Sequence, residues 1–432
     1  MEMFATTFSG ERHVSLYMTE RVIVLGGGAG GTMVANRLDR ELGGLAEVVV
    51  LDRTPTHRYQ PAFYLHPFGH ADIDAHTRDV REYLRADVRF CEATVTGIDP
   101  DERTVATEGG YIEYDRLVVA LGHETVAGPW AGEPHVYPFY RPEGARALGE
   151  TLDALVERAN GADAEPPVAA DGGVATTGTE PTLPTPTTTR PLRVVVTEPE
   201  GSVSCGGAPA KAALLAEDYL ADHGVPCDVT LAGPDDHVFG TGKKARYDAE
   251  LADVFAARGV RYEGGFVVDE VADRRIESED GRTLAYDLYL PVSPQRCPTV
   301  LTDESPLTAA SEEGYVAVDR ETMRHRTHDR VYALGDCTDA PTSKTAAAAR
   351  KQAAALADNL TADAAGRAYE SHYDGFAACP LLTQEGKAIL AGYDYDGAMF
   401  PAVESRVGWL ADVEAIPRLY WQVWLRGYLL GV

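Results

Sequence analysis

The sequence predicts an α/β fold built from two similar units, and two observations support this. An apolar run at 21–25 (RVIVL), a glycine-rich turn and a helical stretch lead to a second apolar run at 47–52 (EVVVLD). The same order recurs between 192–196 (LRVVV) and 227–232 (CDVTLA). A strand, turn, helix and strand in succession indicate a parallel sheet covered by helices. The 432 residues are enough for about three folding units.

The first unit carries a dinucleotide-binding motif in the expected context. Gly26, Gly28 and Gly31 satisfy GxGxxG between the first strand and its helix, and Asp52 ends the next strand. Glycines at these positions let the backbone approach a pyrophosphate at the helix N-terminus, and the carboxylate can bind a ribose hydroxyl. A glycine-rich turn without a ligand is the alternative, but the strand, helix and acid all favour a Rossmann-like domain.

Two later glycines extend the first unit. The predicted strand at 116–121 ends in Gly122, and a strand after about 330 ends in Gly335 and Asp336. The Gly-Asp pair resembles the second signature of flavoproteins with two dinucleotide-binding domains, whose Asp binds FAD. The sequence therefore predicts a discontinuous FAD-binding domain at 20–135 and 321–372. Its predicted FAD-binding residues are Gly26, Gly28, Gly31, Asp52, Gly122 and Asp336, and likeness to related flavoproteins adds Lys344.

The second unit, predicted at 136–320, lacks an intact nucleotide motif. The turn after its first strand reads TEPEGSVSCGGAPAK, with Cys205 where a nicotinamide nucleotide would bind, and its second strand has no acid at its tip. We infer that this domain does not bind NAD(P) and that electrons enter by another route. Residues 161–190 contain eight Thr and five Pro, which predicts a disordered insertion at about 160–191.

Composition excludes several classes of protein. The formal charge is −28, from 67 acidic and 39 basic residues, which argues against nucleic acid as a partner. Only six of the basic residues are Lys, so we predict a halophilic protein whose activity requires molar salt; an ordinary acidic enzyme is the alternative. The cysteines form no CxxC motif, and no metal site is predicted. No role is assigned to residues 1–17, and nothing there resembles a signal peptide.

The C-terminal region, predicted at 373–432, is rich in aromatic residues. Its segment 417–430 would form a helix of about 21 Å, too short to cross a bilayer but suited to lie in the interface. Trp and Tyr would then lie at headgroup level, with Arg reaching the polar surface. A helix packed in the core or in a dimer interface is the alternative.

Six segments spread over most of the chain carry a family likeness. They are the FAD fingerprint at 22–31, RYQPAFYLHPFG at 58–69, SCGGAPAKAALL at 204–215, GDCTDAPTSKTAAAA at 335–349, ACPLLTQEGKAILAGYDY at 378–395 and PRLYWQVWLRGYLLG at 417–431. Through these segments the chain resembles the sulfide:quinone oxidoreductases, and most closely the subgroup that includes the mitochondrial enzymes. It departs from them in Gly206, where the family usually has Ala, and in the insertion.

The resemblance implies that Cys205 and Cys379 form the catalytic disulfide. Hydrogen sulfide, as hydrosulfide, would attack the disulfide and leave one cysteine as a persulfide, while the released thiolate passes electrons to FAD and then to a membrane quinone. The family's usual assignment makes Cys205 the persulfide carrier, but the sequence leaves the roles open. Cys337 is a rival partner because it adjoins Asp336.

Further residues follow from the same resemblance, and the location follows from the N-terminus and the C-terminal segment. Lys344 is a predicted catalytic residue that would stabilise reduced flavin; a solvent-exposed Lys at a helix start is the alternative. Gln352 and Phe400 are predicted to contact quinone, and Phe400 and Trp409 are candidates for lining a quinone channel. The enzyme would lie on the cytoplasmic face of the membrane, and the sequence leaves its oligomeric state open, a homo-oligomer included. The rival functions are a type II NADH:quinone oxidoreductase and a flavin-binding membrane scaffold without turnover.

Overall fold

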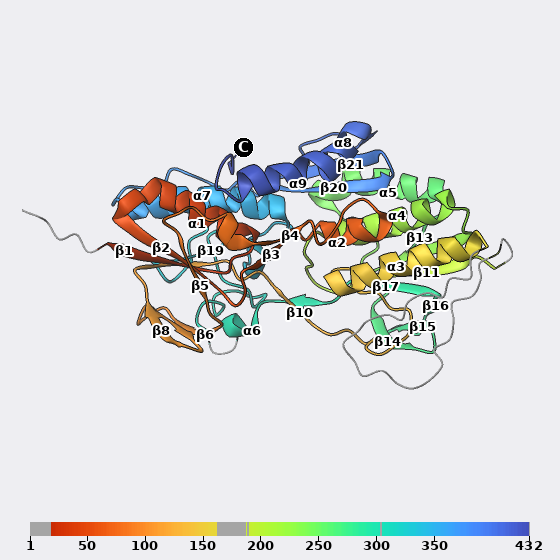
Figure 1. Ribbon diagram of the computed structural model, residues 1–432, viewed down its shortest axis with the longest axis horizontal. Coiled ribbons are helices and arrows are strands. Elements are labelled where there is room, and N and C mark those ends of the chain that lie inside the picture. The colour runs from red at the N-terminus through yellow and green to blue at the C-terminus, as the bar shows by residue number, and fades with distance from the viewer. Residues whose placement is uncertain (1–18, 162–186, 188–189, 303–304, 432) are drawn as a thin grey trace, which may run out of the picture.

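The computed structural model describes residues 19–161, 187, 190–302 and 305–431. The predicted insertion at about 160–191 lies almost entirely outside these residues, as do residues 1–17. Within them the fold is α/β with two parallel sheets, as predicted (Figure 1).

The first parallel sheet has five strands in the order β19-β9-β1-β2-β5. Helices α1 (Ala29–Leu42) and α7 (Ala346–Ala364) pack together against it (Figure 1). Because β19 joins this sheet beside β9, the turn after β19 is brought close to the turn after β1. The strands are β1 (Glu20–Leu25), β2 (Ala46–Asp52), β5 (Arg89–Glu92), β9 (Arg116–Val119) and β19 (Val331–Ala333).

The second parallel sheet has four strands in the order β13-β12-β11-β17. Helix α4 packs on β11 and β12. It begins at Ala208, with Pro209 in its first turn, where a missing N–H costs nothing. The elements are β11 (Leu192–Thr197), β12 (Cys227–Ala232), β13 (Arg261–Glu263), β17 (Leu288–Pro291), α3 (Pro142–Ala159), α4 (Ala208–Asp222) and α5 (Ala245–Arg258).

Smaller elements complete the two units. The antiparallel pair β10 and β18 connects them. These elements are β3 (Thr56–Arg58), β4 (Thr77–Asp79), β6 (Val95–Asp99), β7 (Thr104–Thr107), β8 (Gly110–Glu113), β10 (Glu124–Thr125), β14 (Val268–Ala272), β15 (Arg275–Ser278), β16 (Thr283–Ala285), β18 (Gln295–Arg296), α2 (Ala62–Leu65) and α6 (Thr299–Thr302).

The C-terminal region lies across both units (Figure 1). Its antiparallel sheet β20-β21-β22 packs on α4 and α7, and a helical segment of alternating α and π turns follows. The elements are β20 (Ala377–Gln384), β21 (Lys387–Tyr393), β22 (Glu404–Ser405), α8 (Arg406–Leu410), η6 (Ala411–Ala415), α9 (Ile416–Leu419) and η7 (Tyr420–Trp424).

The predicted helix at 417–430 is wrong in its bounds and in the exposure of its aromatic side chains. The helical segment begins at Arg406 and ends at Trp424. Tyr420 and Trp421 are 3% and 2% exposed and belong to the core of the first unit, because their rings pack against the first unit rather than toward solvent. Among the described helices, none has both the length and the apolar character needed to span a bilayer.

Candidate active site

Two cysteines from distant parts of the chain face each other at the junction of the second unit and the C-terminal region. Cys205 lies in the turn between β11 and α4, and Cys379 lies in β20. Their Sγ atoms are 3.4 Å apart, so a modest rotation would bring them to the disulfide bond length of about 2.05 Å. Cys379 is 2% exposed, while Cys205 is only partly buried. The structure therefore brings together the two cysteines that the resemblance paired.

The backbone around Cys205 allows this approach. Cys205 has a φ of 52°, in the left-handed region that few non-glycine residues occupy. A Cβ added to Gly207 would lie 2.7 Å from the Sγ of Cys379, so this position requires a glycine. By contrast, a Cβ at Gly206 would meet nothing within 4 Å, and the departure from the family's usual Ala has no steric consequence.

A buried cation accompanies Cys205. The Nζ of Lys211, one turn into α4, lies 3.6 Å from the Sγ of Cys205 and 3.9 Å from the ring centroid of Tyr64. Lys211 is 1% exposed. A buried ammonium needs a compensating negative charge, and a thiolate at Cys205 supplies one.

The two thiols therefore differ in acidity. The hydrogen bond with Cys379 and the charge of Lys211 lower the pKa of Cys205 to about 6, against the opposing effect of burial. The same hydrogen bond, followed by burial, raises the pKa of Cys379 well above its ordinary value. The reduced pair thus holds its thiolate on Cys205 and its proton on Cys379.

Cys337, the rival partner, is placed elsewhere. Its Sγ donates to the backbone carbonyls of Leu334 and Val119 at 3.4 and 3.7 Å. Burial raises its pKa to about 11. A thiol held as a neutral donor to backbone carbonyls is suited to packing rather than to exchange.

A hydrogen-bond network joins Cys205 to the turn after β19. The backbone N–H of Cys205 donates to the carbonyl of Lys344 at 2.7 Å, and the hydroxyl of Ser204 donates to the carboxylate of Asp336. His123 lies 3.1 Å from the same carboxylate. Despite burial, the hydrogen bonds from His123 and Ser204 hold the pKa of Asp336 below its usual value.

Lys344 is not the solvent-exposed helix-start residue of the alternative interpretation. Its Nζ donates to the carbonyls of Asp336 at 2.5 Å and Thr338 at 3.1 Å, and lies 3.7 Å from the ring centroid of Tyr315. Burial lowers its pKa. The ammonium is therefore fixed beside Asp336, where a flavin would lie.

The β1-α1 turn has the shape that a dinucleotide requires. Gly26 has a φ of 103°, and a Cβ at Gly31 would lie 1.9 Å from the carbonyl oxygen of Gly26. A Cβ at Gly28 would meet no atom within 4 Å, which leaves open space at the N-terminus of α1. Asp52 accepts a hydrogen bond from the N–H of Gly27 at 2.7 Å, so its carboxylate lies at this turn. These residues fit FAD, with the pyrophosphate at α1.

The two residues predicted to contact quinone are placed differently. Gln352, which is 2% exposed, accepts a hydrogen bond from the N–H of Gly335 at 2.8 Å and lines the same hollow as Asp336 and Lys344. Phe400 lies against Tyr247 of α5, whose hydroxyl donates to its carbonyl at 2.8 Å. The structure groups Gln352, not Phe400, with the predicted FAD residues.

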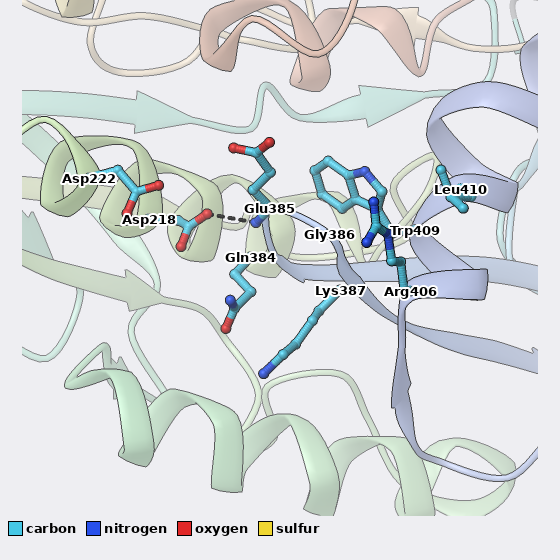
Figure 2. Close-up of a pocket in the computed structure, with 9 residues that line it drawn as sticks. All are labelled: Asp218, Asp222, Gln384, Glu385, Gly386, Lys387, Arg406, Trp409 and Leu410. Atoms are coloured by element: carbon cyan, nitrogen blue, oxygen red, sulfur yellow. Dashed lines mark hydrogen bonds between the residues drawn. The ribbon is translucent and has the colours of Figure 1, made fainter.

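A surface pocket lies away from these residues (Figure 2). It is formed by the end of α4, the β20-β21 turn and α8, and of its lining residues only Trp409 was a predicted candidate, for a quinone channel. The carboxylate of Asp218 accepts a hydrogen bond from the N–H of Glu385 at 2.6 Å (Figure 2). It also accepts one from the guanidinium of Arg258. The pocket therefore lacks a group suited to the predicted chemistry.

The sequence matches the pyridine nucleotide-disulphide oxidoreductase family over residues 20–152 and 210–353. The chain belongs to this family. FAD is the cofactor that this family and the relatives named below bind, which confirms the FAD prediction.

The relatives extend beyond the matched segments. A mitochondrial sulfide:quinone oxidoreductase of Mus musculus is 28% identical over 430 residues, covering 95% of this chain and 87% of the relative. That of Dictyostelium discoideum is 29% identical over 426 residues, with the same coverage. A solved structure of the sulfide:quinone oxidoreductase from Aquifex aeolicus has a TM-score of 0.76 at 20% identity, over 95% of this chain and 92% of that one. The predicted resemblance and fold class of this oxidoreductase are confirmed.

Three site residues were missed by the sequence analysis. Lys211 stands in the quoted motif SCGGAPAKAALL, and Tyr64 stands in RYQPAFYLHPFG, so both were within segments already singled out. Asp412 carries no signal in the sequence. Its carboxylate accepts a hydrogen bond from Tyr64 at 3.3 Å, although the two residues are 348 positions apart.

Proposed function

We propose that this chain oxidises hydrogen sulfide to sulfane sulfur through a Cys205–Cys379 disulfide and passes the electrons through FAD to a membrane quinone. The observation that carries the proposal is the pair of sulfurs 3.4 Å apart, hydrogen-bonded through Cys205 to the turn that holds Lys344 and Asp336. The names of the relatives support the same substrate and acceptor. Bound FAD would supply the two-electron acceptor between the cysteine pair and the quinone.

The acidity of the two thiols supports a direction for the attack. Hydrosulfide bonds to the Sγ of Cys379, the bond between the cysteine sulfurs breaks, and Cys205 leaves as a thiolate. The thiol with the lower pKa leaves faster, and Lys211 lies 3.6 Å from this leaving sulfur. Cys379 thus becomes the persulfide, which reverses the family's usual assignment stated above.

The position of Cys205 agrees with this order. Its backbone is bonded to Lys344, and its neighbour Ser204 is bonded to Asp336, so the thiolate forms on the side where FAD would be bound. Cys379 lies in β20, and its Sγ borders Gly207 together with Leu381 and Phe239. In this order Cys379 carries the sulfane sulfur and Cys205 passes the electrons on.

The membrane surface is the proposed second partner, on the cytoplasmic face. Of the ten large hydrophobic side chains that are exposed in the described part of the chain, eight lie in the C-terminal region. Exposed apolar side chains concentrated in one region of the chain suit peripheral insertion into a bilayer interface. The eight are Met399, Phe400, Val403, Val407, Leu410, Leu419, Tyr428 and Leu429.

The function is tested by anaerobic stopped-flow spectroscopy of the flavin after mixing with sulfide or with NADH. Sulfide should bleach the flavin of the wild type, and Cys205→Ser and Cys379→Ser should each abolish this reaction, while dithionite still reduces all three proteins. Decylubiquinone should then reoxidise the reduced wild type. Bleaching by NADH that is indifferent to both substitutions would instead make the chain an NADH:quinone oxidoreductase, and no reoxidation by quinone would support the scaffold.

The membrane surface is tested separately by co-sedimentation with vesicles of anionic and zwitterionic phospholipids at high salt. We expect Val407→Glu together with Leu410→Glu to reduce the bound fraction at least fivefold, because two charges would enter the apolar layer. The matched control is Leu45→Glu together with Tyr111→Glu, which charges the two exposed apolar side chains outside the C-terminal region. Equal loss in both pairs would argue against a specific membrane face.

A further inference from the structure

One buried cation lies close to two groups that can each carry a negative charge. The Nζ of Lys211 is 3.6 Å from the Sγ of Cys205 and 3.9 Å from the ring centroid of Tyr64. The hydroxyl of Tyr64 donates to the carboxylate of Asp412 at 3.3 Å. Lys211 and Asp412 are 1% and 4% exposed, so water does little to screen either charge.

Asp412 comes from outside the cysteine-bearing elements. It lies in η6 of the C-terminal region, whereas Lys211 lies in α4 and Tyr64 in α2. The side chain of Tyr64 therefore contacts both groups: its ring faces the ammonium of Lys211, and its hydroxyl donates to the carboxylate of Asp412.

Among the described residues, the other acidic groups around Lys211 are neutral. Burial raises the pKa of each neighbouring phenol well above its ordinary value, at Tyr59, Tyr64 and Tyr140. The thiol of Cys379 keeps its proton for the reason given above. This leaves Cys205 and Asp412 to compensate the charge of Lys211. A second cation, Lys244, also interacts with the cysteine pair but is present in both redox states.

Two anions beside one ammonium in a buried site are unfavourable, because one negative charge is left uncompensated in low dielectric. The charge of Asp412 accordingly raises the pKa of Cys205, and burial raises the pKa of Asp412 while Lys211 lowers it. When the cysteines form a disulfide, neither sulfur carries a charge, and Asp412 becomes the counter-ion. When the pair is reduced, Cys205 takes that place.

We propose that Asp412 takes up a proton when the Cys205–Cys379 disulfide is reduced and releases it when the disulfide re-forms. Two electrons and two protons enter the site: the disulfide bond breaks, Cys205 becomes a thiolate, Cys379 a thiol and Asp412 a carboxylic acid. The charges of Lys211, Cys205 and Asp412 then sum to zero in both states. The inference deepens the proposed function, since it concerns the same pair.

The test measures the equilibrium between the cysteine pair of the FAD-loaded protein and dithiothreitol, without oxygen, between about pH 7 and 8. Acid quenching followed by maleimide labelling counts free Cys205 and Cys379. At a pH below its own thiol pKa, dithiothreitol releases two protons together with two electrons when it is oxidised. The equilibrium constant of the wild type should therefore not change with pH. In Asp412→Asn the site accepts only one proton, so the constant should rise about tenfold per pH unit.

Two controls separate proton uptake from a structural effect. Asp39→Asn, on α1, removes a similarly buried carboxylate that pairs with Arg85, and it should behave like the wild type. Lys211→Arg keeps the cation and should also keep the pH-independent constant. The same pH dependence in the wild type and in Asp412→Asn would overturn the proposal.

Infrared difference spectra of the wild type decide the matter if Asp412→Asn does not fold. Reduction should produce a new carboxylic-acid carbonyl band that shifts on exchange into heavy water, and its absence would refute the proton uptake. Neither experiment uses sulfide. A chain that failed to oxidise sulfide could thus still show proton uptake, and an active chain could lack it.

Discussion

The ammonium of Lys211 lies 3.6 Å from the Sγ of Cys205, almost completely buried within a chain of net charge −28. Lys is scarce here, with six in the chain, so a buried one is not a by-product of composition. A local positive charge favours the thiolate at Cys205 and, in an otherwise acidic protein, the approach of an anion such as hydrosulfide.

Replacing Lys211 with Met should raise the pKa of Cys205 from about 6 toward or above that of a free thiol. The thiolate fraction at pH 7 should then fall roughly thirtyfold. The rate of iodoacetamide alkylation at Cys205 in the reduced protein, followed against pH, measures this directly. Lys211→Arg is the matched control, because a guanidinium remains charged when buried. A pKa unchanged in Lys211→Met would show that the hydrogen bond with Cys379 acts alone.

Gly207 separates the two cysteine-bearing elements, and its substitution should move them apart. In Gly207→Ala the new Cβ would lie 2.7 Å from the Sγ of Cys379 and 2.6 Å from Leu381. We expect a loss of about 1 to 3 kcal/mol in the free energy of unfolding and slower flavin reduction by sulfide. Urea unfolding and stopped-flow traces check the two effects. The neighbouring Gly206→Ala meets no atom within 4 Å and should change neither.

Much of the fold could be predicted because it depends on local signals. The apolar run at 21–25, the glycines that follow it and Asp52 lie within one stretch of chain, and each marks its own element. The prediction for the C-terminal helix was wrong because the burial of its side chains depends on residues far away in the sequence. Tyr420 and Trp421 look like interfacial side chains in isolation, but the core of the first unit buries them.

The site was predictable only in part, for the same reason. Cys205 and Cys379 were paired through a family resemblance and not through spacing, since 174 positions separate them. The contact between Tyr64 and Asp412 bridges a still longer separation, and no motif marks Asp412. The identity of the leaving thiolate depends on a neighbouring charge, which only the folded arrangement reveals. The halophilic character and the predicted domain boundaries stay predictions.

Gly28 offers a test of the FAD site that leaves the protein scaffold intact. A Cβ at this position meets no protein atom within 4 Å, so Gly28→Ala should melt like the wild type as apoprotein. It would occupy the space at the N-terminus of α1, where a pyrophosphate would lie, so we expect FAD to bind at least tenfold more weakly. Fluorescence titration of apoprotein with FAD measures this, and Gly44→Ala, equally uncrowded, is the control. Unchanged affinity in Gly28→Ala would place the pyrophosphate elsewhere.

Glu198, directly after β11, has a carboxyl group whose burial disfavours the ionised form. Its Oε1 has no hydrogen-bond partner among the described residues, and burial, followed by the charge of Asp235, raises its pKa to about 8. In the unfolded chain the pKa is about 4.3. The side chain therefore costs no stability at low pH, where both states are protonated. It lowers the free energy of unfolding progressively as pH rises from about 4 through about 8.

Glu198→Gln keeps the shape of the side chain and cannot ionise, so it should remove this loss. We expect the mutant to gain about 2 kcal/mol over the wild type between pH 6 and 9, a value reduced for the partial exposure of Glu198. Urea unfolding of both proteins at the two pH values measures the gain. The exposed Glu200→Gln should show none. A gain in Glu198→Gln that is equal at pH 6 and 9 would mean that the carboxyl is already ionised in the folded protein, and that its neighbours compensate its charge.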